Sequence, residues 1–367
     1  MAEKAIRLGG ESTAAAITQA VQELYPEHKF TEAEFARKDN AAEIAVDTNF
    51  AAQSFWKDVR IRFFRKKSAV LGLIMIFVIL LLAIFGPGMN DYTYSGQDLS
   101  QKNFAPRVPG IEQFGILDGS EKMSTTTGTK IVNNYVEKGK DDVYYWFGSD
   151  LYGRDIWTRT WEGARVSLII AVAAAIIDML IGMSYGLISG YFGGRVDMVM
   201  QRFLEVANGI PRLVIVTLLL LVLQPGMVTI IFALMLTEWV GMSRIARAEM
   251  LKLKDQEFVL ASRTLGAGSF FIIFKEVLPN IIGPIITQVM FSIPTAIFTE
   301  AFLSFVGLGI PVPQCSLGSL ISELYNSFTT HPYQIIPPIV VMSLLMLSFN
   351  LVADGLREAL DPKMKSM

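Results

Sequence analysis

Long apolar runs, separated by short polar or turn-forming stretches, occupy most of the chain after residue 68. With their flanks, six of these runs are long enough to cross a bilayer as helices. They cover residues 69–85, 166–189, 213–223, 227–242, 281–306 and 335–353. Pro225 and Gly226 predict a tight turn between the short third run, which follows Pro211, and the fourth. The pattern therefore predicts an all-α integral membrane protein with six transmembrane helices.

Composition agrees with this class and argues against several others. Hydrophobic residues make up 52% of the chain, which is above the usual globular range. The formal net charge is only -2, so bulk charge indicates no nucleic-acid partner. Two histidines and one cysteine provide neither a metal cluster nor a disulfide framework.

The distribution of Lys and Arg predicts the orientation. Basic residues crowd the start of the first run and place the N-terminus inside under the positive-inside rule. They are Lys57, Arg60, Arg62, Arg65, Lys66 and Lys67. Six spans return the C-terminus to the same side, and segment 307–334 lacks Lys and Arg, as expected of an outside loop. Cys315 lies in that loop, so we expect an impermeant thiol reagent to reach it from outside, or at least when the loop is loosened.

These assignments divide the chain into five segments. They are a cytoplasmic tail (1–55), a first transmembrane helix with a basic interfacial start (56–89), a small extracellular subdomain (90–147), a core with five transmembrane helices and a cytoplasmic loop at 243–280 (148–360), and a cytoplasmic C-terminal tail (361–367). We expect an interfacial helix near Phe55 to Phe64, and short strands or hairpins in the subdomain. The aromatic run at 143–147 is interpreted as membrane-interface anchors rather than a ligand cage.

The cytoplasmic loop is cationic and has small residues at its centre. The basic residues around segment 257–268 are Arg244, Arg247, Lys252, Lys254, Arg263 and Lys275. A short helix with Ala, Ser and Gly at its middle, presented outside the bilayer, suits docking into a groove of another protein. An ordinary amphipathic loop is the alternative interpretation.

The spacing in this loop resembles the cytoplasmic EAA loop of ABC-importer permeases. The pattern falls on Leu260-Ala261-Ser262, Gly266 and Leu278-Pro279, with Leu260 in place of the usual Glu and Glu276 in place of the usual Ile. The resemblance implies a short helix that inserts into a cleft of an ATP-binding subunit. The implied coupling residues are Leu260, Ala261, Ser262, Arg263, Leu265, Gly266 and Ala267.

The segment before the second apolar run indicates which group of ABC-importer permeases the chain resembles. Residues 148–155 read Gly-Ser-Asp-Leu-Tyr-Gly-Arg-Asp and resemble a signature of peptide-importer permeases, together with Thr158-Arg159, Gly163-Ala164-Arg165 and Ser167-Leu168. Segments 304–310, 350–357 and 360–362 match the same group. The chain is therefore similar to the second, C-type permease subunit of an oligopeptide or dipeptide ABC importer. This resemblance implies the type I ABC-importer permease fold.

The signature residues are expected on the extracellular side. They are Asp150, Gly153, Arg154, Asp155, Arg159 and Arg165. We interpret them as a folded plug or scoop, held by Arg–Asp pairing, beneath a docked substrate-binding protein. A plain salt-bridge cluster at the membrane surface is the alternative. No Ser-His-Asp constellation or zinc ligand set accompanies them, which argues against hydrolysis.

Energy for transport would come from outside this chain. No Gly-x-x-x-x-Gly-Lys-Ser/Thr phosphate loop occurs, so ATP and Mg would be bound by partner subunits and no cofactor by this non-enzymatic subunit. The implied partners are a homologous permease subunit, one or two ATP-binding subunits, an extracellular peptide-binding protein, the peptide and the lipid bilayer. The implied location is the bacterial cell (cytoplasmic) membrane. Peptide length and side-chain preference stay open.

Three carboxylates suggest an alternative function. Asp178, Glu238 and Glu300 fall at or near membrane depth, where an ionisable group is costly unless it is paired or faces a cavity. They could form the proton relay of a proton-coupled secondary transporter of peptides or other small solutes, or make interhelical hydrogen bonds. Small residues on the second run indicate close helix packing. These are Ala171, Ala173, Ala174, Ala175, Gly182 and Gly186.

Overall fold

The computed structural model describes residues 55–125 and 128–361, so the predicted tails lie almost wholly outside the described residues. The helices are α4 (Phe55–Arg65), α5 (Lys67–Phe85), α6 (Asn134–Glu137), α7 (Ile156–Ile177), α8 (Ser184–Phe192), α9 (Gly194–Gly209), α10 (Arg212–Val222), α11 (Met227–Thr237), α12 (Trp239–Leu253), α13 (Glu257–Thr264), α14 (Ser269–Phe271), α15 (Leu278–Leu303), α16 (Leu317–Tyr325) and α17 (Ile336–Leu360). Two strands, β1 (Ser120–Thr125) and β2 (Gly128–Asn133), form one antiparallel hairpin.

Five continuous helical stretches are long and apolar enough to cross a membrane. They are Lys67–Gly88, Ile156–Phe192, Met227–Leu253, Ser269–Leu308 and Pro332–Leu360. They correspond to the first, second, fourth, fifth and sixth predicted spans, and several extend well beyond the apolar runs. π-helical turns at Asp178–Met183 and Ile272–Val277 join neighbouring helices within the second and fourth stretches. The predicted interfacial helix is α4.

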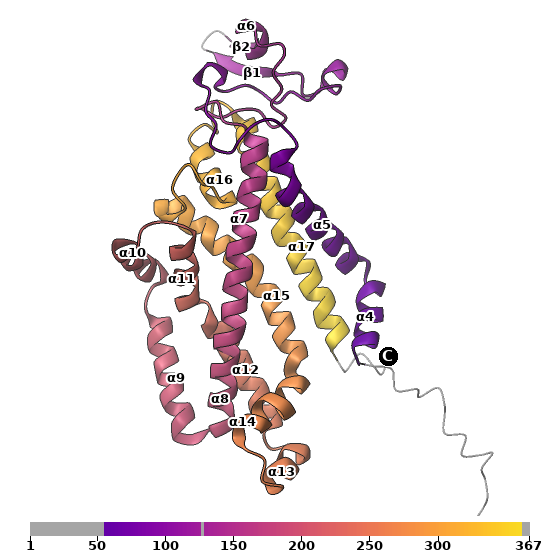
Figure 1. Ribbon diagram of the computed structural model, residues 1–367, viewed down its shortest axis with the longest axis vertical. Helices are drawn as coiled ribbons and strands as arrows, with labels where there is room; N and C mark the ends of the chain where they lie inside the picture. The colour runs from indigo at the N-terminus through magenta and orange to yellow at the C-terminus, as the bar shows by residue number, and fades with distance from the viewer. Residues whose placement is uncertain (1–54, 126–127, 362–367) are drawn as a thin grey trace, which may run out of the picture. The chain divides into compact units, whose positions relative to one another are not determined.

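The third span departs from the prediction. The prediction is a short span at 213–223 that follows Pro211, but α10 has only 11 residues and rises about 16 Å, which is too short to cross alone. It follows α9 at a bend of 78° (Figure 1). Pro211 causes the bend, because it disfavours helical dihedrals at Ile210, whose backbone is extended. In place of the third predicted span the structure has the bent pair of α9 and α10, which is long and apolar enough to cross a membrane only when the two helices are taken together.

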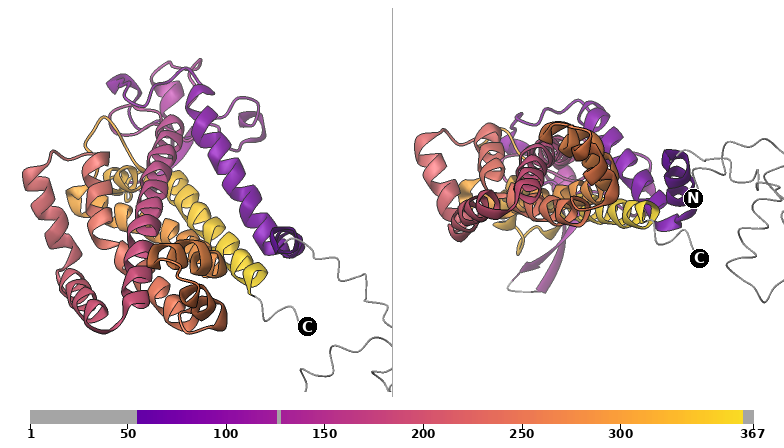
Figure 2. Two further views of the ribbon diagram at one scale, coloured as in Figure 1. Left: turned by 60° about the horizontal axis from the view of Figure 1, so that its bottom comes forward. Right: turned by 90° about the horizontal axis from the view of Figure 1, so that it is seen from below.

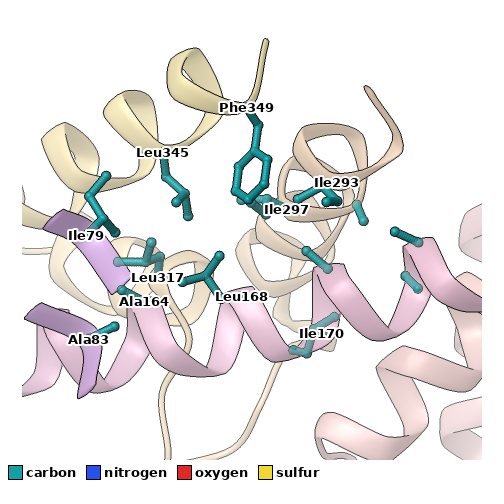
Figure 3. Close-up of a cluster of buried hydrophobic side chains, with 14 of the residues drawn as sticks. Ile79, Ala83, Ala164, Leu168, Ile170, Ile293, Ile297, Leu317, Leu345 and Phe349 are labelled. Carbon is teal, nitrogen blue, oxygen red and sulfur yellow. The ribbon is translucent and has the colours of Figure 1, made fainter. Parts of the chain in front are cut away.

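The core is organised around α7. On one side of α7 lie α5 and α17, and on the other lie α9 and α10 (Figure 1, Figure 2). Apolar side chains of α5, α7, α11, α15, α16 and α17 form one buried cluster, which includes Leu168 of α7, Ile297 of α15 and Phe349 of α17 (Figure 3). The predicted small-residue packing is confirmed farther along, since a Cβ on Gly186 would stand 2.1 Å from the Ser243 carbonyl oxygen of α12.

The predicted small subdomain contains the β1–β2 hairpin and sits at one end of the helices (Figure 1), called here the hairpin end. The opposite end, which carries α13, is called the α13 end. Phe104, Tyr135 and Tyr145 form the apolar centre of the subdomain. The anchor interpretation of residues 143–147 is therefore wrong for Tyr145, which is only 1% exposed. The subdomain is tied to the segment before α17 by Gln334, whose Nε2 donates to Asn103 Oδ1 at 3.0 Å.

Candidate functional site

The loop at the α13 end folds into a short helix with a defined stop. Gln256 has extended backbone, and Glu257 in the first turn of α13 complements the helix dipole. At the other end, the Ala267 N–H donates to the Ser262 carbonyl and the Gly266 N–H to the Arg263 carbonyl, both at 3.0 Å. This pair of bonds is a Schellman motif.

Gly266 occupies the left-handed position of that motif. Its φ is +83°, a value that side chains with a Cβ rarely adopt. A Cβ built there would meet nothing within 4 Å. The requirement for glycine is therefore conformational, not a matter of room.

Val259 is the buried side chain of α13, and most of the others are exposed. Val259 is fully buried against Met250, Ile272 and Ile273. Apolar residues on the outward side form what we call the α13 surface. It consists of Phe258, Leu260, Ala261, Leu265, Phe270 and Phe271, of which Leu265 is 88% exposed.

The predicted coupling residues divide between this surface and its support. Arg263 and Gly266 are exposed, whereas Ser262 and Ala267 are half-buried. The Arg263 guanidinium lies 5.5 Å from the centre of the Tyr191 ring, so it braces α13 against the end of α8. The sequence reasoning missed Phe258, Phe270 and Phe271, although their position on either side of the small-residue segment was a usable signal.

At the hairpin end, four charged side chains form a closed group, called here the Arg–acid cluster: Asp150, Arg154, Arg159 and Glu323. Asp150 Oδ2 accepts from Arg154 Nε at 2.6 Å and from Arg159 Nη1 at 2.8 Å. Glu323 Oε2 accepts from Arg159 Nη2 at 2.7 Å, and Arg154 also donates to Glu323. Two positive and two negative groups thus neutralise one another.

The charged groups of the Arg–acid cluster are buried, so each depends on its partners for stabilisation. Asp150, Arg154 and Arg159 are at most 3% exposed. Burial alone would raise the pKa of Glu323, but the Arg159 and Arg154 guanidinium groups outweigh it and hold that pKa below its ordinary value. Sequence reasoning missed Glu323, which is the only acidic residue in segment 307–334.

The other signature residues have separate positions. The predicted Arg–Asp pairing is made by Asp150, whereas Asp155 has no arginine partner among the residues that the structure describes; its Oδ2 caps α7 by accepting from the Thr158 N–H at 2.8 Å. Gly153 has φ +71°, and a Cβ there would stand 1.8 Å from the Asp98 carbonyl oxygen. Arg165 donates from Nε to the Ala83 carbonyl at 3.0 Å, at the end of α5. The signature therefore joins α7 to its neighbours as well as forming the cluster.

Cys315 is not on the surface, so the expectation that a reagent reaches it directly is wrong. It is 1% exposed, because α16 folds over it and places Leu320 and Leu324 against the thiol. Its Sγ lies 3.5 Å from the Arg159 carbonyl oxygen, and burial raises the pKa of the thiol.

We expect an impermeant maleimide to modify Cys315 in the native protein at least about tenfold more slowly than in the urea-unfolded chain, since reaction requires local opening. Leu320→Ala should accelerate the reaction by loosening the packing over the thiol. Mass spectrometry of the labelled chain measures both rates. Equal rates in native and unfolded protein would contradict the burial.

The three carboxylates predicted at membrane depth have different surroundings. Glu300 is fully buried, and Oε1 accepts from Ser304 Oγ at 2.7 Å and from Ser316 Oγ at 2.5 Å. Glu238 forms a 2.7 Å ion pair with Arg212. Asp178 is 3% exposed, and its Oδ1 has no hydrogen-bond partner within the described residues. Two of the three thus make contacts between helices.

A cavity of about 650 Å³ opens between α12, α15 and α17 near the α13 end. Apolar side chains such as Phe291 line it together with Thr287 and Gln288. Both charge signs are present among its lining residues. The charged residues are Glu249, Lys252, Arg357 and Asp361.

Comparison with known proteins shows the family of this chain. The model of the binding-protein-dependent transport system inner membrane component matches residues 182–366, and that of the N-terminal TM domain of oligopeptide transport permease C matches residues 54–106. The chain belongs to the family of binding-protein-dependent transport system inner membrane components. The family predicted from the motifs is thereby confirmed.

Individual relatives cover most of the chain. The oligopeptide transport system permease protein OppC of Bacillus subtilis (strain 168) is 42% identical over 312 residues, which is 85% of this chain and 91% of that protein. The dipeptide transport system permease protein DppC of the same organism is 40% identical over 85% of this chain and 87% of that protein. DppC of Lactococcus lactis subsp. cremoris (strain MG1363) is 42% identical over 85% and 92%. A chain of the MetNI methionine ABC transporter aligns with TM-score 0.47 at 15% identity, covering 54% of this chain and 94% of that chain.

Proposed function

We propose that this chain is a transmembrane subunit of an ATP-driven importer of oligopeptides or dipeptides. In this proposal it forms the translocation path with a homologous permease subunit. The observation that carries the proposal is the 42% identity to OppC over 85% of the chain. The family model that matches residues 182–366 includes the loop that bears α13. The proposed location is the bacterial cytoplasmic membrane, with both termini and the α13 end inside.

The α13 surface is the proposed contact with an ATP-binding subunit. Exposed apolar side chains on a short helix outside the bilayer suit a groove in another protein. ATP and Mg would be bound by that subunit. Helix α14, the π-helical turn and α15 form one continuous stretch, Ser269–Leu308, so a displacement at the α13 end is transmitted directly into a span. Pro284 and Pro294 inside α15 are points where this lever can bend.

The proposed path for the peptide includes the cavity between α12, α15 and α17. A peptide carries a carboxylate at one end, and the guanidinium of Arg357 in the lining suits that group, whereas Lys252 and Glu249 of the lining pair with each other at 2.6 Å. The peptide itself would be delivered by an extracellular binding protein at the hairpin end. The closed pairing of the Arg–acid cluster favours a supporting role for it, because its charges satisfy one another instead of facing a partner.

Transport in reconstituted vesicles tests the proposal. Uptake of a labelled peptide should require ATP, the ATP-binding partners and the external receptor, and it should persist when a protonophore collapses the pH gradient. Glu300→Gln keeps the acceptor oxygen for Ser316 and should leave the ATP requirement unchanged. Uptake by this chain alone that follows the proton gradient would establish the secondary-transporter alternative instead.

A further inference from the structure

Helix α4 has one face packed against the protein and an apolar face that points away from it. Val59 and Phe63 are buried against residues of α17 that include Val352 and Ala359. At 100° per residue, Ile61 and Phe64 lie on the opposite side of the helix. They are 44% and 55% exposed. Helix α4 therefore presents apolar side chains on two opposite faces.

Cations flank this outward face. Lys57, Arg60, Arg65 and Lys67 are exposed, and within residues 55–125 and 128–361 none of them has an ion-pair partner. Two neighbouring basic residues, by contrast, have ion-pair partners: Arg62 pairs with Asp58 at 2.6 Å and Lys66 pairs with Glu358 at 2.5 Å. The protein thus neutralises the inward cations and leaves four outward ones uncompensated.

The position of α4 at the start of a membrane span indicates that its outward face contacts lipid. Span α5 begins at Lys67, directly after an extended residue, and Figure 2 shows α4 turned away from the line of α5. Leu71, Ile74 and Phe77 are exposed along α5, as expected of a surface in contact with acyl chains. Helix α4 consequently stands at the level where acyl chains give way to phospholipid headgroups.

We propose that α4 and the first residue of α5 form a binding site for anionic phospholipids. Ile61 and Phe64 enter the acyl boundary, while Lys57, Arg60, Arg65 and Lys67 extend to the phosphate level and pair with negatively charged headgroups. Each such cation near an anionic leaflet adds to the attraction, so four of them select anionic over zwitterionic lipid. The site is independent of the transport proposal.

The site has a mechanical consequence. Lys66 holds the end of α4 to Glu358 near the end of α17, and a Cβ on Gly355 of α17 would stand 2.3 Å from the Ala69 Cβ. Helix α17 in turn packs along α15. Lipid bound at α4 therefore fixes one edge of the helical core at the bilayer surface.

Fluorescence quenching of Trp56 tests the proposal. The full-length chain is reconstituted in phosphatidylcholine vesicles containing a small fraction of lipid with brominated acyl chains, either phosphatidylglycerol or phosphatidylcholine. The difference between the wild type and Trp56→Phe isolates the signal of Trp56 from the other four tryptophans. We expect brominated phosphatidylglycerol to quench Trp56 at least about threefold more effectively than brominated phosphatidylcholine, with a preference that weakens as salt is raised.

Charge variants decide whether the four cations cause this preference. Lys57→Gln/Arg60→Gln/Arg65→Gln/Lys67→Gln should abolish it, whereas Arg60→Lys/Arg65→Lys should retain it. The matched control Lys102→Gln/Lys122→Gln/Lys130→Gln/Lys138→Gln removes the same charge at the hairpin end and should retain it too. Melting temperature in detergent shows that each variant is folded.

Four results would overturn the proposal. Equal quenching by the two lipids in the wild type would remove the site. If the lipid preference survives in the α4 variant, groups other than the four cations cause it. If the preference disappears equally in the hairpin-end control, it depends on the total charge of the protein. Loss of the preference when the ATP-binding partners are added would show that an acidic protein surface, not lipid, occupies these cations.

Discussion

Replacing Arg159 with methionine is expected to lower the stability of the protein by about 3–5 kcal/mol, the range seen when one partner of a buried ion pair is removed. Asp150 and Glu323 would then share only Arg154 in a site where Asp150 is 1% exposed. Water cannot replace the lost guanidinium at such a site without opening it. Methionine keeps most of the volume, so the loss is electrostatic and not a cavity effect. Thermal and denaturant unfolding in detergent, followed by near-UV circular dichroism, measures the change.

An exposed ion pair supplies the matched control. Arg202 pairs with Glu205 at 2.7 Å, but their side chains are 77% and 57% exposed. Arg202→Met should therefore cost less than about 1 kcal/mol. A double-mutant cycle with Arg159→Met and Glu323→Gln should show strong coupling, because neutralising Glu323 removes part of the charge that Arg159→Met leaves unpaired. Equal effects of Arg159→Met and Arg202→Met would show that the cluster is not electrostatically important.

The spans show how far the sequence determines the fold. Hydropathy located five of them, because a helix needs about 20 apolar residues to cross a bilayer and so long an apolar run is easily recognised. The third predicted span differs from the structure because its apolar part, α10, is only one member of a bent pair of helices. The other member, α9, carries Arg195, Asp197 and Gln201, and Asp197 is compensated by an ion pair with Arg247 of α12 at 2.6 Å. Such pairing between distant helices cannot be read from a local window.

In the candidate sites too, features that depend on nearby residues were predictable and features that depend on distant residues were not. The α13 segment was predictable because its helix, its glycine stop and its outward face depend on neighbours within about ten positions. The Arg–acid cluster was not, because Glu323 stands 164 positions from Arg159. Arg–Asp pairing was predicted for the signature as a whole, but of its two aspartates Asp150 makes it, whereas Asp155 stands before α7 and caps that helix. The burial of Cys315 likewise depends on α16, which the lack of Lys and Arg in that loop did not reveal.

Gly266→Ala is expected to reduce ATP-dependent peptide uptake by about 5- to 30-fold while leaving the amount of protein in the membrane unchanged. An alanine at φ +83° carries roughly 1–2 kcal/mol of strain. The chain relieves that strain by unwinding the Schellman motif, which displaces Leu265 and its neighbours on the α13 surface. A free-energy penalty of roughly 1–2 kcal/mol lowers the population of the docked form by about 5- to 30-fold, which is the expected loss of uptake. Uptake and peptide-stimulated ATP hydrolysis in reconstituted vesicles measure the effect.

Two variants separate backbone strain from the bulk of the new side chain. Gly268 is also exposed and has open space around it, but its φ is −69°, so Gly268→Ala should change uptake by less than about twofold. Asn tolerates the left-handed region better than Ala, so Gly266→Asn should retain more activity although its side chain is larger. Glycine, asparagine and alanine at position 266 should therefore rank in that order of activity. If Gly266→Ala transports normally, or if Gly268→Ala is equally impaired, the conformation of this turn does not govern coupling. The wild-type ATP requirement would then have to be explained by another contact of the α13 end.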